Sequence, residues 1–299
     1  MMQHKAALTV AEPTGDSRGI ARGHGGIGDA AYAAGHFRTA HDHFALAIQH
    51  AEKAGLGLVR EEYLFMRAFS RFFADPGPDA FLLADIAVES SQQCGAARTE
   101  TVAREVRAEM RLVAGDLDGV AEDIRAIDTL TRVRGEIRVT NDVQILRAYL
   151  DLRAGNRARA QELLAPILVG AETNADVGAT ALGLSALMAR DRAERDGILA
   201  KGMICAQDVA LSHSVVWFHL CALERAVADS DRDLALRHIA ALQAFSAKEP
   251  IGLVDMIIRS IKLALWPSTE GERRDHTARL REACLGDLVR FVEPQVQKA

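Results

Sequence analysis

The chain has 299 residues, of which 49% are hydrophobic and 26% charged, a composition that excludes an intrinsically disordered protein. Its formal net charge is −5 at pH 7, so overall charge favours neither nucleic acid nor an anionic membrane as a partner. The four cysteines are far apart and form no CxxC pair; they are Cys94, Cys205, Cys221 and Cys284. This pattern predicts buried thiols in a reducing compartment, and therefore a cytoplasmic protein.

The N-terminal segment contains Pro, Gly and acidic residues and only a short apolar patch. It is a poor signal peptide, so residues 1–21 are expected to be a flexible leader. No uninterrupted apolar run in the chain approaches the roughly 18 residues that a membrane-spanning helix needs. The sequence therefore predicts no membrane partner.

From about Ile27 onward, helical periodicity dominates and no run alternates like a strand. Turn markers recur at Gly35, Gly115 and Gly155, spaced 80 and 40 residues apart, and Asp75 occupies the missing place. A fixed period of this size is typical of stacked supersecondary units.

Small and apolar residues repeat with the same period around these turns. Seven residues before each marker are Gly28, Ala68, Ala108 and Ala148, and five residues after it are Ala40, Ala80, Val120 and Ala160. Nine residues after each marker are Phe44, Ala84, Ile124 and Leu164, and twelve residues after it are Ala47, Ala87, Ile127 and Ile167. Small residues where two helices cross, followed by larger apolar residues on one helical face, predict a series of helical hairpins.

The segment from Gly35 to Ile48, "GHFRTAHDHFALAI", resembles the turn and second helix of a tetratricopeptide repeat (TPR). The resemblance covers about residues 22–170 in four units. Two features depart from the family: Arg104 and Arg111 replace first-helix aromatics in the third unit, and the period is near 40 instead of about 34. The longer period resembles the repeats of bacterial regulator scaffolds of the maltose-activator type.

This resemblance implies an all-α fold, a right-handed superhelical array of about six to seven helical hairpins. Three less regular helix pairs follow residue 170, and atypical terminal units are usual where they cap an array. The expected organisation is a leader at 1–21, one continuous TPR-like domain at 22–292 and a flexible tail at 293–299.

Aromatic residues concentrate in one expected helix, "EEYLFMRAFSRFFA" at 61–74. At 100° per residue its apolar sector spans about 200°, so the helix must contact neighbours on two sides. Two alternatives stay open. The aromatics line a groove that accepts an apolar segment, or the array curls tightly and they form its core.

The resemblance implies a noncatalytic scaffold that binds a protein or peptide segment in its concave groove. The groove residues it assigns are Phe65, Phe69, Phe72, Tyr149 and Trp217 as apolar anchors, with Arg153 as a partner for a carboxylate. No cofactor or metal is expected, and self-association through a terminal helix is compatible with the repeats. The alternatives are a sensor that encloses a small molecule or signalling peptide, and an enzyme with Glu105 and Glu109 in a cleft.

Three further motifs carry little weight. "GHGGIG" at 23–28 lacks the preceding strand of a dinucleotide-binding fingerprint. His36, His41 and His43 do not project toward one point on a hairpin, and His213 and His219 are separated by about 120°. None of them predicts a nucleotide or metal site.

Overall fold

The computed structural model describes residues 2–134 and 140–293, and within these ranges every regular element is helical. Sixteen α-helices and two short 3-10 helices are assigned there: α1 Met2–Thr14, α2 Ser17–Ala33, α3 Phe37–Lys53, α4 Gly57–Ala74, α5 Pro78–Gln93, α6 Ala97–Ala114, α7 Leu117–Arg134, α8 Thr140–Arg153, α9 Arg157–Leu168, η1 Ala171–Thr173, α10 Gly178–Leu187, α11 Arg192–Asp208, α12 Ser212–Ala228, α13 Arg232–Phe245, α14 Gly252–Leu265, α15 Glu270–Glu282, η2 Gly286–Leu288 and α16 Val289–Val292. The all-α prediction is confirmed for the described residues.

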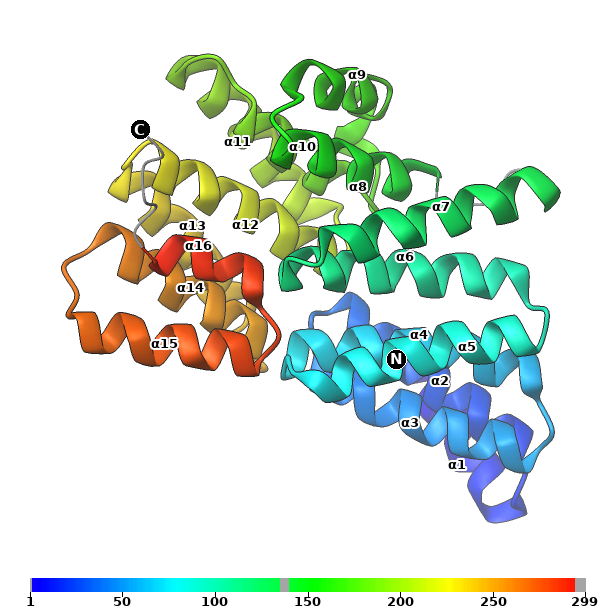
Figure 1. The fold of residues 1–299 in the computed structure, drawn as a ribbon. Helices are drawn as coiled ribbons and strands as arrows, with labels where there is room; N and C mark the ends of the chain where they lie inside the picture. The colour runs from blue at the N-terminus through cyan, green and yellow to red at the C-terminus, as the bar shows by residue number, and fades with distance from the viewer. Residues whose placement is uncertain (1, 135–139, 294–299) are drawn as a thin grey trace.

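Consecutive helices pack side by side in pairs, as Figure 1 shows for α2 with α3, α4 with α5 and α6 with α7. The repeating small and apolar positions explain this packing, because all sixteen of them are buried. At Gly28, an added Cβ would lie 2.6 Å from the Phe44 ring, so the crossing of α2 and α3 needs a residue without a side chain.

The glycines that mark the turns within the pairs have a left-handed backbone conformation. Gly35, Gly115 and Gly155 have φ angles of 76°, 81° and 84°. Asp75 is extended instead, with φ near −160°. A second 40-residue series, Gly15, Gly55 and Gly95, has φ between 64° and 67° and ends the last helix before each new pair. Glycine adopts this conformation at little steric cost, so both series terminate helices.

The N-terminal segment differs from the flexible leader that the sequence predicts. Residues Met2–Thr14 form α1, which buries Leu8 and Ala11 against Ile20 and Ile27 of α2. The apolar patch is short, but it suffices to cover one face of α2. Apart from Glu293, the expected tail lies outside the described residues.

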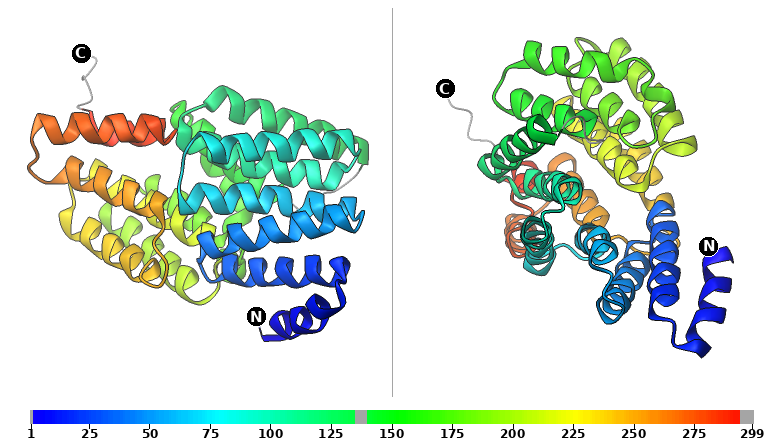
Figure 2. Two further views of the ribbon diagram at one scale, coloured as in Figure 1. Left: turned by 90° about the horizontal axis from the view of Figure 1, so that it is seen from below. Right: turned by 90° about the vertical axis from the view of Figure 1, so that its right-hand side faces the viewer.

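The C-terminal helices lie beside the N-terminal half (Figure 2), with α14 against α4 and η2 against α6. Helix α12 also contacts the early helices. The Trp217 and Phe73 rings are 5.3 Å apart, and Ser212 donates a hydrogen bond to the Tyr32 carbonyl oxygen. These contacts join α12 to α4 and α2, between residues about 140 to 180 apart in sequence.

The aromatic helix α4 is largely part of the core. The exposed fractions of Phe69 and Phe72 are 3% and 0%, and only Phe65 among the three groove candidates on this helix is half-buried. Phe73 stacks on Phe37 with ring centroids 4.4 Å apart. For Phe69 and Phe72 the structure therefore corresponds to the core alternative.

A buried ion cluster joins α6 to α7. The carboxylate of Asp123, fully buried, accepts hydrogen bonds from Arg104, Arg107 and Arg111 at 2.6–3.1 Å. Arg104 and Arg111 are the two residues at which the sequence departs from the tetratricopeptide resemblance. An acidic residue on the second helix thus compensates for cationic residues on the first.

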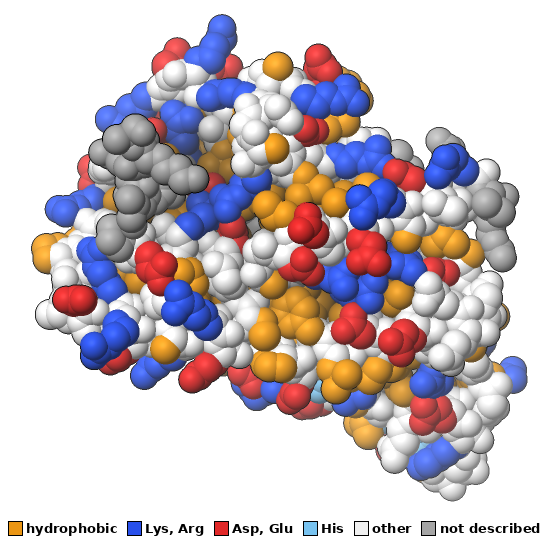
Figure 3. All heavy atoms as spheres, viewed as in Figure 1, with side chains coloured by type: hydrophobic (Ala, Val, Ile, Leu, Met, Phe, Trp, Pro, Cys, Tyr) orange, Lys and Arg blue, Asp and Glu red, His pale blue; other side chains and the backbone are white. Residues whose placement is uncertain are grey.

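The surface mixes charges of both signs, and the face in Figure 3 shows apolar side chains gathered near its centre. None of the described helices is long and apolar enough to cross a bilayer. All four cysteines are free thiols. Cys205 and Cys221 are buried as predicted, whereas Cys284 is half-buried and Cys94 is exposed, so the prediction of buried thiols is wrong for Cys94.

Candidate functional site

A hollow of about 720 Å³, including space open to solvent, lies between the helices that begin successive pairs. Its wall comes from α6, α8, α10, α12, η2 and the segment that leads into α10. Much of that volume is open to solvent, and the enclosed space is about 70 Å³, below the roughly 300–1,000 Å³ typical of small-molecule sites. The hollow is therefore a partly open concavity that encloses only a small chemical group.

Most of the wall is apolar, but five carboxyl groups interrupt it. The apolar residues are Leu112, Val113, Ile145, Leu146, Val177, Leu184, Leu220 and Cys221, with the rings of Tyr149 and Trp217. The acidic residues are Glu109, Asp142, Asp176, Glu224 and Asp287. No Lys or Arg is among the described residues that line the hollow.

At one end of the hollow the carboxylates are neutralised by arginines behind the wall. Arg290 donates to Glu224 at 2.7 Å and to Asp287 at 3.0 Å, and Arg153 pairs with both acids. The Tyr149 hydroxyl donates to Asp287 at 3.4 Å. Two acids and two arginines form a closed network, so this end of the hollow carries no net charge.

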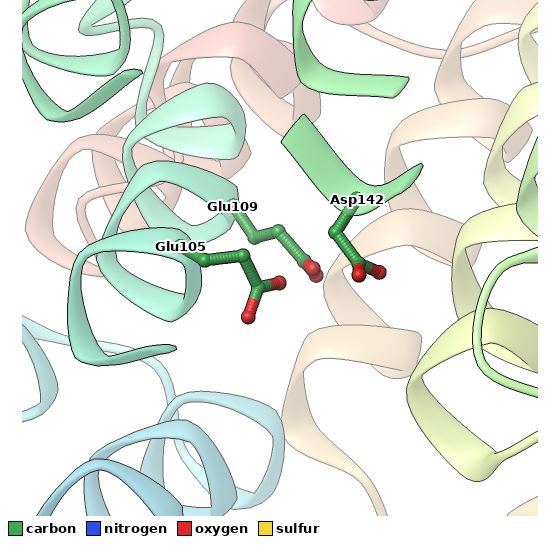
Figure 4. Close-up of side chains that lie close together, drawn as sticks. All are labelled: Glu105, Glu109 and Asp142. Atoms are coloured by element: carbon green, nitrogen blue, oxygen red, sulfur yellow. The ribbon is translucent and has the colours of Figure 1, made fainter. Parts of the chain in front are cut away.

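The other end is acidic. Ligand oxygens of Glu105, Glu109 and Asp142 all lie within 4.8 Å of one another, and Figure 4 shows the two glutamates of α6 and the aspartate of α8 facing a common space. The Trp217 indole N–H donates to Glu109 at 2.5 Å. Oxygen donors at this spacing are able to share a hard divalent cation, or to face the charged group of an organic cation.

Burial raises the pKa of Glu105 well above its usual range, and the neighbouring Glu109 charge and hydrogen bond raise it further. The side chain of Glu105 is 8% exposed. A negative charge on the neighbouring Glu109 disfavours ionisation of Glu105, so the raised pKa of Glu105 favours its protonated form. A bound cation would relieve this repulsion.

No family model, curated protein or solved structure matches this chain. The chemistry of the hollow therefore has to be inferred from its own residues.

Next to the acidic end, His213 and Tyr32 form a buried polar contact. The Tyr32 hydroxyl and His213 Nδ1 are 2.9 Å apart, and burial lowers the pKa of His213. The imidazole is therefore neutral at neutral pH. It supplies a polar edge to the hollow without adding positive charge.

The structure brings only part of the predicted groove together. Tyr149 and Trp217 line the hollow, and Arg153 lies behind its neutral end, where its carboxylate partners are Asp287 and Glu224 of the chain itself. Phe65, Phe69 and Phe72 are not part of the wall. Glu105 and Glu109, the carboxylates of the enzyme alternative, are at the acidic end.

The remaining motifs adopt other roles. "GHGGIG" lies inside α2, where an added Cβ at Gly25 would meet the Tyr63 hydroxyl oxygen at 2.1 Å. These glycines allow close helix packing and form no phosphate-binding loop. His219 faces His238, with Nδ1 atoms 2.8 Å apart, away from His213.

Replacing Glu105 with glutamine should change how stability depends on pH. Because the folded-state pKa of Glu105 is raised, the folded wild type retains a proton that the unfolded chain loses above about pH 4.5. Its free energy of unfolding therefore falls as pH rises, by up to about 1.4 kcal/mol per pH unit from this group. Urea unfolding at about pH 5 and about pH 8 should show Glu105→Gln gaining stability relative to wild type at the higher pH.

Glu122→Gln, at an exposed position of α7, provides the control and should show no such gain. A constant difference between Glu105→Gln and wild type at both pH values would mean that Glu105 is ionised throughout, contrary to its raised pKa.

Proposed function

We propose that the helix pairs form a right-handed, TPR-like superhelical array curled around the hollow. The first helices of four successive pairs supply most of the wall, as expected for the concave side of such an array. The buried 40-residue ladder supports this arrangement. Cys205 and Cys221, both free and buried, support a cytoplasmic location.

We infer that the protein is a noncatalytic sensor that encloses a small organic cation with an apolar body. The observation that carries this proposal is the chemistry of the hollow: apolar and aromatic walls end at Glu109, whose carboxyl group interacts with that of the buried Glu105 behind the wall. The apolar wall favours a carbon skeleton, and the acidic end favours an ammonium or guanidinium group.

The ligand's position follows from the same contacts. Its charged group would face Glu109, close to the buried Glu105, where a positive charge favours loss of the Glu105 proton. The Trp217 ring, fixed by its hydrogen bond to Glu109, and the Tyr149 ring would contact the apolar body. Aromatic faces also attract cations, which adds to the preference for positive charge.

A protein segment is the second candidate ligand, and one observation favours it. Leu46 of α3 and Ile86 of α5, one repeat apart, are exposed together with Leu82. Exposed apolar side chains on second helices are able to contact a partner helix. This surface lies apart from the hollow, so the two proposals are tested separately.

The cation proposal is tested with 2-phenylethylamine, using 3-phenylpropionate as an anionic analogue and 2-phenylethanol as a neutral one. The amine should raise the melting temperature of the protein, because a ligand that binds only the folded state stabilises it. The anion should leave the melting temperature unchanged, and the alcohol should raise it by less than the amine does. Calorimetry should show tighter amine binding as pH rises, since Glu105 must lose its proton.

Glu109→Gln should weaken amine binding by about 10- to 100-fold, because a hydrogen bond to a charged group contributes roughly 1.5–3 kcal/mol. Glu122→Gln on the exposed face of α7 serves as the matched control. Equal binding of the three compounds, or stronger binding of the anion, would contradict the proposal.

A further inference from the structure

The neutral end of the hollow holds a carboxylate that belongs to the chain itself. Asp287 lies on η2 and is 8% exposed. Its carboxylate accepts hydrogen bonds from the Arg153 guanidinium, from Arg290 at 3.0 Å and from the Tyr149 hydroxyl at 3.4 Å. Guanidinium groups make strong, charge-assisted hydrogen bonds to carboxylates, so the chain surrounds this one with the donors of an anion site.

The backbone that carries Asp287 is fixed without help from its carboxylate. Leu285 and Leu288, on either side of Asp287, are fully buried in the main apolar core. Gly286 approaches the end of α6 so closely that an added Cβ would lie 2.5 Å from the Ala114 carbonyl oxygen. A packed surrounding relaxes only partially when a side chain is shortened, so loss of the Asp287 carboxylate should leave a space of carboxylate size.

Asp287 separates two cations from the hollow. The side chains of Asp287 and Glu224 belong to the wall, whereas those of Arg153 and Arg290 do not. Glu224 accepts a hydrogen bond from Arg290 at 2.7 Å and lies 3.6 Å from the Arg153 guanidinium. Without Asp287, two guanidinium groups would share one carboxylate, and this end of the hollow would carry an excess of positive charge.

We propose that Asp287 is the residue that makes the hollow select organic cations over carboxylates. It does so by occupying, from within the chain, an anion subsite formed by Arg153, Arg290 and Tyr149. This role rests on the proposed function of the hollow and specifies which ligands the hollow rejects. A ligand carboxylate would find both arginines already paired and a like charge at the wall, and burying it unpaired is unfavourable.

The first test is rescue of Asp287→Ala by formate, which has the shape of the group that the substitution removes. The variant should melt below the wild type, because two partly buried guanidinium groups lose a partner. Sodium formate should raise its melting temperature toward that of the wild type, and sodium chloride at the same ionic strength should not. If Asp287→Ala is largely unfolded, formate should restore its helical circular dichroism.

Asp287→Asn is the matched control, because asparagine removes the charge but fills the space. It should also be destabilised, and formate should not rescue it. Combining Asp287→Ala with Arg153→Gln should weaken the rescue, since one of the two cations is then missing. The proposal would be overturned if formate failed to stabilise Asp287→Ala, if it stabilised both Asp287 variants equally, or if the rescue were undiminished in the double variant.

The second test measures the ligand preference itself. Calorimetry should show 3-phenylpropionate binding to Asp287→Ala at least about 10-fold more tightly than to the wild type, because its carboxylate gains hydrogen bonds from charged donors. Rescue by formate without this gain would overturn the role of Asp287 in specificity. Failure of 2-phenylethylamine to bind the wild type would instead refute the proposed function, and the formate result does not depend on it.

Discussion

Phe72→Ala should lower the free energy of unfolding by about 3–5 kcal/mol, the cost of removing a large buried ring and leaving a cavity. Phe72 is fully buried, and its ring lies 5.9 Å from that of Phe73 and 5.8 Å from that of Phe81, both in edge-to-face arrangements. Phe81 is on α5, so the cavity would open where α4 packs against α5. Thermal and urea unfolding measure the effect.

Phe65→Ala on the same helix is the matched control, because Phe65 is only half-buried. Its truncation should cost clearly less than that of Phe72. If Phe72→Ala left stability unchanged, the ring would be free for a partner and the groove alternative would return for this helix. A large loss for Phe72 and a small one for Phe65 would establish the core.

The repeats were predictable because packing fixes them locally. Ala40, Ala80 and Ala160 are each fully buried, and a larger side chain at a helix crossing would push the pair apart. A requirement repeated every 40 residues leaves a visible period in the sequence. The second series, Gly15, Gly55 and Gly95, is an equally regular signal that the sequence analysis did not use.

The hollow was not predictable in the same way. Its acidic and polar residues come from separate elements, from Glu109 on α6 to Asp287 on η2, and no local pattern links them. Sequence reasoning named Glu105 and Glu109 only as the carboxylates of an alternative enzyme cleft. The partners that define the site, such as Trp217 and Asp142, become neighbours only when the helices pack.

The aromatic helix α4 shows that helical periodicity predicts how much of a helix is buried but not which neighbours bury it. A 200° apolar sector indicates that α4 contacts neighbours on two sides, but not which neighbours they are. The first-helix positions that would face an open groove instead meet α12 and α14, as the Phe73–Trp217 contact illustrates. Curvature depends on small offsets between successive pairs, which the sequence of one pair does not specify.

Asp123→Asn should lower the free energy of unfolding by about 3–5 kcal/mol, because removing one partner leaves buried charges uncompensated. The Asp123 carboxylate faces three guanidinium groups, with Arg107 donating to both of its oxygens. Asparagine has nearly the same shape but no charge, and its amide NH₂ is a donor facing other donors. Urea unfolding at neutral pH, followed by circular dichroism, measures the loss.

Asp85→Asn is the control that removes an ion pair without removing a buried charge. Asp85 also pairs with Arg107, at 2.8 Å, but its side chain is 47% exposed. Solvent screens such a pair, so its removal should cost no more than about 1 kcal/mol. Similar losses in the two variants would mean that burial of Asp123 adds nothing. The expected contrast would show that α6 accommodates Arg104 and Arg111 near the helix crossing because one buried carboxylate on α7 accepts hydrogen bonds from both of them.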